Sequence, residues 1–277
     1  MNHKILANCR QAFLSPIFFL SAAGTAAILF ISCSGQLITA CRTFHESALL
    51  ETAAQTGTVR ETLHGQEQLL EYGFHGNLIL TALSSNTLVM IFPIVSALPF
   101  TASYIDDIKS GFIKEYLPRI GRSNYIKGKL IACIASGGTV FIAGVLLAYG
   151  ISALVFSPME AALEANAENP GYLLQIIRQC GLYFCSGALW SLVGMTLSAA
   201  TGSKYMAYAS PFIFYYILII LYERYFKDLY VLCPREWLSP SEYWPLGNWS
   251  AALWVLELCL LCSLYFYRIA QKKLEHI

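Results

Sequence analysis

Apolar residues in this chain gather in six long stretches without charged side chains, apart from one acid in the last. The stretches are Gln11–Cys41, Tyr72–Ile105, Leu130–Met159, Gln179–Ser203, Tyr205–Tyr222 and Tyr243–Tyr267. A membrane-spanning helix needs about 20 mostly apolar residues, because hydrocarbon offers the backbone no hydrogen bonds and a helix satisfies its own polar groups. The pattern therefore predicts an all-α membrane protein with six transmembrane helices.

We expect one transmembrane domain over residues 1–277. Its predicted spans cover about 16–38, 78–103, 130–156, 179–200, 205–222 and 248–267. Small residues recur along the third and fourth spans, which favours close packing of these two helices against their neighbours. A polar, acidic outer segment, 42–77, separates the first two spans.

Two further elements are expected at the membrane surface. Residues 3–14 have an apolar face, which predicts an N-terminal helix lying at the lipid interface. Residues 223–247 mix aromatic side chains with charges and prolines. Because amphipathic aromatics favour the headgroup region, we expect an outer re-entrant hairpin before the last span, with an ordinary aromatic-rich loop as the alternative.

Composition and charge agree with a polytopic membrane protein and orient it. Hydrophobic residues make up 56% of the chain and charged residues only 13%, whereas soluble domains carry about 25% charge. With both termini on one side, that side holds twelve of the 18 Lys and Arg residues and four of the 17 acids. Short cytoplasmic loops are enriched in Lys and Arg, so both termini are expected in the cytoplasm.

The sequence lacks the motifs of several enzyme classes. No G-x-x-x-x-G-K-[ST] loop, G-x-S-x-G or H-E-x-x-H occurs, and the histidines have no metal-ligand spacing, so we expect neither an enzyme nor a metal site. Cys41, Cys180 and Cys233 lie near the predicted outer face, where disulfides and free thiols are equally compatible with the sequence. Nothing indicates nucleic-acid binding.

Few polar residues lie inside the predicted spans. Asn86 and Thr87 lie near the middle of the second span, where helix–helix hydrogen bonding and a substrate path are weighed equally. Glu257 is the one intramembrane acid. A structural or packing role is favoured for it over a proton relay. Since ion-driven carriers normally place several ionisable groups in the bilayer core, a transporter of this composition would need a separate energy source.

The inner loop between the second and third spans is the natural contact for such a source. Its residues 107–117 predict one amphipathic helix that Pro118 ends, with an apolar face that must bury against lipid or a partner protein. Both occupants are compatible with the pattern. The residues expected to form this element are Asp107, Ile108, Phe112, Ile113, Lys114, Tyr116 and Leu117.

The run from Asp107 through Ser110, Gly111 and Arg122-Ser123 to Tyr125 and Gly128-Lys129 resembles the inner loop of ABC-2-type transporter permeases. The similarity extends to the six spans, the interfacial N-terminal helix and the outer hairpin. It implies the membrane subunit of a bacterial ABC exporter in the plasma membrane, working as a homodimer or pseudo-dimer. A partner ATPase would bind ATP and Mg, with no cofactor in this chain, and residues 107–117 would form the cytoplasmic coupling helix.

The resemblance implies export. Asn86 and Thr87 are candidate residues of the central cavity, and an amphipathic substrate, such as a peptide, a lipid-like molecule or a drug, is compatible with such an apolar, weakly polar cavity. One departure is the long first outer segment, which such permeases often keep short. It leaves the substrate and any further outer partner open. In the alternative function, a membrane sensor or immunity subunit binds an external peptide through residues 42–77 without exporting it.

Overall fold

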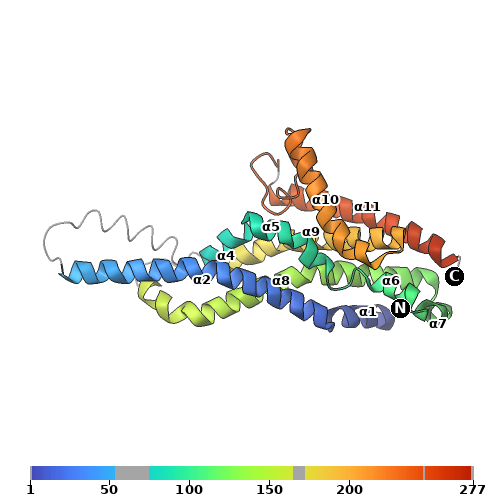
Figure 1. Ribbon diagram of the computed structural model, residues 1–277, viewed down its shortest axis with the longest axis horizontal. Helices are drawn as coiled ribbons and strands as arrows, with labels where there is room; N and C mark the ends of the chain where they lie inside the picture. The colour runs from blue at the N-terminus through green and yellow to red at the C-terminus, as the bar shows by residue number, and fades with distance from the viewer. Residues whose placement is uncertain (1, 54–74, 165–171, 246, 276–277) are drawn as a thin grey trace.

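The computed structural model describes residues 2–53, 75–164, 172–245 and 247–275 (Figure 1). Within these ranges the regular structure is helical, with no strand. The helices, in chain order, are α1 (Asn2–Phe13), α2 (Pro16–Ala53), α4 (His75–Leu83), α5 (Asn86–Ala97), α6 (Ser103–Lys109), α7 (Phe112–Ile120), α8 (Arg122–Glu164), α9 (Tyr172–Thr201), α10 (Lys204–Arg224), the 3₁₀ helix η1 (Tyr230–Leu232) and α11 (Asn248–Glu275).

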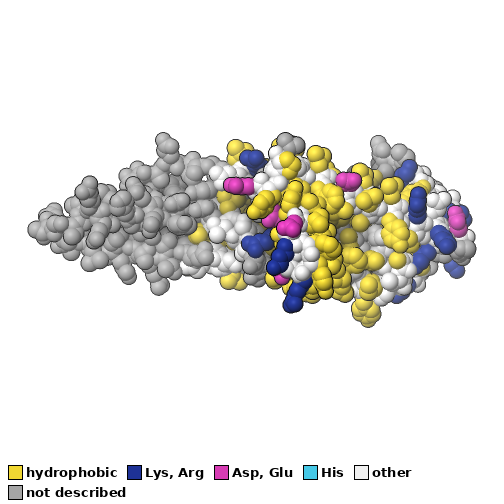
Figure 2. Space-filling model, turned by 90° about the horizontal axis from the view of Figure 1, so that it is seen from above, with side chains coloured by type: hydrophobic (Ala, Val, Ile, Leu, Met, Phe, Trp, Pro, Cys, Tyr) yellow, Lys and Arg dark blue, Asp and Glu magenta, His cyan; other side chains and the backbone are white. Residues whose placement is uncertain are grey.

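Five of the described helices are long and apolar enough to cross a membrane. Their candidate spans are Pro16–Gly35, Arg122–Phe156, Leu173–Thr201, Lys204–Arg224 and Trp249–Glu275. On the face shown in Figure 2, apolar side chains cover the middle of the described part, and Lys and Arg gather at the right-hand end, while a second group of Lys and Arg lies among Asp and Glu side chains toward the opposite end. The chain is therefore a multi-pass helical membrane protein, as the hydrophobic pattern predicted.

Helix α9 forms the centre of the bundle, since 72% of its most apolar window is buried against 22% for both α10 and α11. It meets α8 where two glycines face each other. A Cβ on Gly187 would lie 2.5 Å from the carbonyl oxygen of Gly137. Only glycine permits such an approach of two backbones. Gly144 and Gly194, which belong to the predicted stripes of small residues, also pack closely, because a Cβ on either would meet a backbone oxygen of α2 or α10. Their predicted role in packing is confirmed.

The predicted second span is interrupted. Helix α4 ends at Leu83, α5 begins at Asn86 and ends at Ala97, and turns follow to the start of α6. The polar run that begins at Ser84 offers the backbone alternative hydrogen bonds, which favours a break. The Tyr183 hydroxyl donates to the freed carbonyl oxygen of Leu83 at 2.7 Å. One continuous helix over 78–103 was therefore wrong, although α4 and α5 follow one another along the bundle (Figure 1).

The N-terminal helix is confirmed as α1, a separate helix before α2. It packs against the start of α8, where the side-chain amide of Asn8 lies 2.7 Å from the position of a Cβ on Gly128, and Ala12 is fully buried. One face of α1 is therefore covered by the protein itself. Helix α2 continues beyond its apolar span to Ala53, so the first part of the outer segment 42–77 extends the same helix.

The aromatic segment between α10 and α11 consists of turns and η1 in its described residues. Trp237 anchors it by stacking on Trp190 of α9, with ring centroids 5.9 Å apart. The re-entrant hairpin stays a prediction. Cys180 and Cys233 are both free thiols, and the side chain of Cys41 lies outside the described residues.

Candidate coupling site at the end of the bundle

The element predicted as one helix over 107–117 is two helices. Helix α6 ends at Lys109, Gly111 takes a left-handed conformation with φ of 76°, and α7 begins at Phe112. A residue with a Cβ rarely adopts such a conformation, so Gly111 is the natural breaking point. Pro118 does not end α7, which continues to Ile120 and stops at Gly121, where φ is 83°. The expectation of one continuous helix was therefore wrong.

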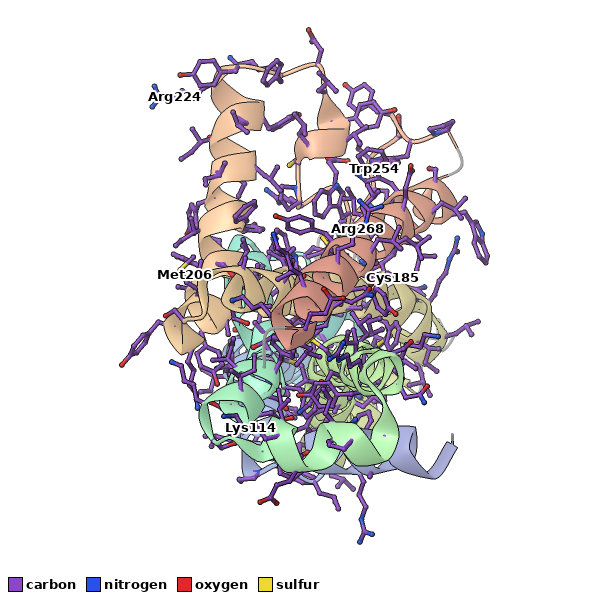
Figure 3. All side chains as sticks on the ribbon, turned by 90° about the vertical axis from the view of Figure 1, so that its right-hand side faces the viewer. Lys114, Cys185, Met206, Arg224, Trp254 and Arg268 are labelled. Carbon is purple, nitrogen blue, oxygen red and sulfur yellow. The ribbon has the colours of Figure 1, made fainter. Side chains whose placement is uncertain are left out.

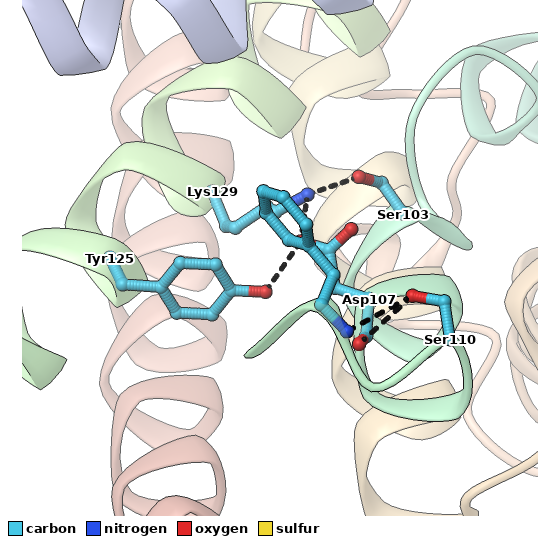
Figure 4. Close-up of polar contacts among 6 residues, drawn as sticks. Ser103, Asp107, Ser110, Tyr125 and Lys129 are labelled. Carbon is cyan, nitrogen blue, oxygen red and sulfur yellow. Dashed lines mark hydrogen bonds and ion pairs between the residues drawn. The ribbon is translucent and has the colours of Figure 1, made fainter. Parts of the chain in front are cut away.

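A buried lysine fixes α6 to α8 (Figure 4). The Lys129 Nζ lies 2.8 Å from a carboxylate oxygen of Asp107, and it donates a hydrogen bond to the Ser103 hydroxyl. The Tyr125 hydroxyl donates to the same Asp107 oxygen at 2.7 Å. Lys129 is only 1% exposed, and its ammonium lies 4.9 Å from the ring centroid of Phe100, a favourable cation–π distance.

Sequence reasoning counted Lys129 only as a cytoplasmic charge and as part of the loop resemblance. It did not pair this residue with Asp107. One local signal was present, since Tyr125 and Lys129 are four residues apart and share a helix face. The ion pair with Asp107 could not be predicted from the sequence, because no periodicity connects residues on different helices.

A second ion pair joins α6 to α10. The Lys204 Nζ lies 2.9 Å from a carboxylate oxygen of Asp106, with the two side chains 48% and 47% exposed. An exposed pair of this kind stabilises the fold weakly. The pair matters here for its position, because it connects the start of α10 to α6, the same short helix that Lys129 contacts.

Aromatic contacts connect α6 to α11. Tyr104 is fully buried, and its ring meets Phe266 edge-on with centroids 5.2 Å apart. Its hydroxyl has no hydrogen-bond partner among the described residues. Burial raises the pKa of Tyr104 to about 12, so the hydroxyl stays neutral. Nearby, the Tyr267 hydroxyl of α11 lies 3.2 Å from the Ser123 hydroxyl of α8. Helix α6 therefore touches three long helices through specific side chains.

The predicted anchors on α7 divide into buried and exposed residues. Ile113 is only 1% exposed within the chain itself, whereas Phe112 is 47% exposed. Ile108 and Leu117 are half-buried, Lys114 is exposed, and the side chain of Tyr116 lies outside the described residues. Ile113 is thus a core residue and cannot be a surface anchor, because the protein covers the apolar face that the pattern detected.

A cleft of about 510 Å³ runs between α7 and the end of α11. Leu117 and Pro118 line one side, Leu274 lines the other, and Lys114 and Arg122 are the basic residues at its edge. Viewed along the long axis of the molecule, α6 and α7 lie across this end of the bundle, with Lys114 on their exposed side (Figure 3). The end of the bundle therefore offers both an exposed aromatic ring and an adjacent hollow.

The remaining predicted site residues lie away from this end. Asn86 and Thr87 begin α5, and their side chains lie outside the described residues. Glu257 lies on α11 with its side chain exposed, and no hydrogen bond or ion pair joins it to a described residue. The packing role favoured for Glu257 stays a prediction. The described residues hold no cluster of His, Cys, Asp and Glu that would bind a metal ion.

Comparisons with protein-family models, with curated proteins and with solved structures found no match.

Proposed function

We propose that this chain is the membrane-spanning permease subunit of an ATP-driven exporter. The observation that carries the proposal is the attachment of α6. Asp107 joins it to Lys129 of α8, Asp106 joins it to Lys204 of α10, and Tyr104 packs on α11. A force applied to the α6–α7 element would therefore reach three long helices at once, which a coupling element requires.

In this mechanism a separate ATPase subunit binds ATP and Mg and presses on α7 as it closes. The surface for that contact is Phe112 with its exposed neighbours Lys109 and Glu115, since Ile113 is already buried. The buried Lys129–Asp107 pair makes α6 move together with the start of α8. Rocking of these helices would then alternate access to a central cavity, as in other carriers.

The proposal includes a dimer and an amphipathic substrate. Helices α10 and α11 are largely uncovered, with 22% of each apolar window buried, which leaves room for a second permease beside them in the bilayer. Helices α4 and α5 together form the sixth crossing, because α5 alone rises only about 18 Å. Asn86 and Thr87, at the start of α5, are the candidate substrate path.

The same arrangement supports an orientation of the chain in the membrane. The two termini and α7 lie at one end of the molecule (Figure 1), and Lys and Arg gather there (Figure 2). This supports a cytoplasmic location for both termini in the plasma membrane. The α6–α7 element then faces the compartment where ATP is found.

Recovery of an ATPase with the tagged chain tests the proposal. The wild-type protein is expected to co-purify with an ATP-hydrolysing subunit, and Phe112→Ala to reduce that recovery while insertion and thermal stability stay unchanged. Lys272→Ala, an exposed residue near the end of α11 that does not line the cleft beside α7, is the control. Recovery undiminished by Phe112→Ala would contradict the coupling assignment. Association without substrate-stimulated hydrolysis would favour a sensor over an exporter.

A further inference from the structure

A second cleft, of about 540 Å³, lies far from the coupling site, between α11 and the aromatic segment that precedes it. The segment contributes Tyr230 and Trp244, and α11 contributes Leu253, Trp254 and Glu257. Trp254 lies on α11 next to this segment (Figure 3). The volume is in the range of small-molecule sites, and the lining combines aromatic and aliphatic surface with a single carboxylate.

Among the described residues that line this cleft, Glu257 is the one with a charged side chain. It lies about 12 Å along α11 from the exposed Trp249, within a candidate membrane span whose neighbouring Leu256, Leu260 and Leu261 are exposed on the surface of the chain. No described residue donates a hydrogen bond or a positive charge to it. A carboxylate in such surroundings is expensive unless a cation accompanies it. A bound cation would supply this counter-charge.

The aromatic walls suit a cation. Tyr230 meets Trp244 edge-on with centroids 5.2 Å apart and stacks with Tyr243 at 6.1 Å. Aromatic faces attract ammonium groups, most strongly where water is excluded. The indole nitrogens of Trp244 and Trp254 are buried and have no acceptor among the described residues. Trp244 itself is only 6% exposed. The aromatic lining of the cleft therefore suits the positive charge of an ammonium group.

We propose that this cleft binds the ammonium group of an amphipathic organic cation. Glu257 is the counter-ion, the aromatic rings enclose the ammonium, and the leucines of α11 receive the apolar tail. The ammonium has two sources in a membrane, the headgroup of an aminophospholipid or a free amphiphile. The proposal concerns binding alone and holds whether or not the chain is a transporter.

Binding of tritiated dodecyltrimethylammonium tests the proposal. The full chain is held on scintillation beads in neutral maltoside micelles, and the probe is added below its micellar concentration. Saturable binding is expected, and Glu257→Gln should weaken it at least tenfold. Trp254→Leu should weaken it severalfold, which gives a second test that does not alter the acid. Glu242→Gln, an exposed acid on the same segment outside the cleft, is the matched control and should bind as the wild type does.

Competition separates the two sources of ammonium. Displacement of the probe by phosphatidylethanolamine, but not by phosphatidylglycerol, would assign the site to a lipid headgroup, and no displacement by either would assign it to a free amphiphile. Absence of saturable binding, or equal affinity in Glu257→Gln of unchanged melting temperature, would overturn the proposal. A loss of dimer in Glu257→Gln with cation binding intact would instead assign the cleft to a second copy of the chain.

Discussion

Removing the charge of Lys129 is the sharpest test of how α6 is held. The Lys129 and Asp107 side chains are 2% and 17% exposed and 2.8 Å apart. Breaking a buried pair from one side costs about 3–5 kcal/mol, because the other charge is left uncompensated. Asp107 keeps the Tyr125 hydrogen bond and some access to water. We therefore expect Lys129→Met to lower the free energy of unfolding by about 3 kcal/mol, the lower end of that range.

The assay is thermal unfolding of the purified chain in detergent. About 3 kcal/mol corresponds to a fall in melting temperature of about 6–12 °C for a chain of this size. The double variant Asp107→Asn with Lys129→Met removes both charges and keeps an acceptor for Tyr125, so it should recover to within about 1 kcal/mol of the wild type. Lys204→Met, which breaks the exposed pair with Asp106, should cost about 0–1 kcal/mol.

Two results would refute this reasoning. A Lys129→Met protein that melts with the wild type would mean that the ion pair does not hold α6. A double variant no better than the single variant would mean that the loss comes from packing of the lysine stem and not from the unpaired acid.

Three other changes test separate parts of the structure. Ser110→Cys should react with a membrane-impermeant thiol reagent in inverted vesicles and stay unlabelled in intact cells, and labelling in intact cells would reverse the proposed orientation. Ile113→Ala should lower the free energy of unfolding by about 2–5 kcal/mol, because this side chain is only 1% exposed. Thermal melting measures the change, and an unchanged melting temperature would mean that Ile113 is not a core residue. Gly187→Ala should destabilise the protein by about 1–3 kcal/mol, since its Cβ would meet a backbone oxygen of α8 at 2.5 Å. Gly181 lies on the same helix as Gly187, but a Cβ there would meet nothing within 4 Å. Gly181→Ala should therefore leave the free energy of unfolding unchanged or raise it by about 0.4–1 kcal/mol.

The sequence by itself determined the class of this protein and the positions of most of its long helices. Helices α2, α8, α9, α10 and α11 each contain one of the predicted spans in full, although α2, α8, α9 and α11 extend beyond it by more than one turn at one end or both. Hydrocarbon imposes a local requirement, an uninterrupted apolar run long enough to cross it. Whether a segment meets this requirement can be judged from its own sequence alone. The amphipathic pattern of the inner loop could be recognised in the same way, because helical periodicity is also a property of a single segment.

Only the tertiary structure decided which residue pairs with which. The apolar face of residues 107–117 predicted that something covers it, yet the pattern could not tell lipid or a partner from the protein's own bundle, which covers Ile113. The pairing of Lys129 with Asp107 and the contact of Tyr104 with Phe266 join helices far apart along the chain. Contacts of this kind depend on how helices pack in three dimensions. The periodicity of one helix shows which face is buried, but it does not show which other helix covers that face.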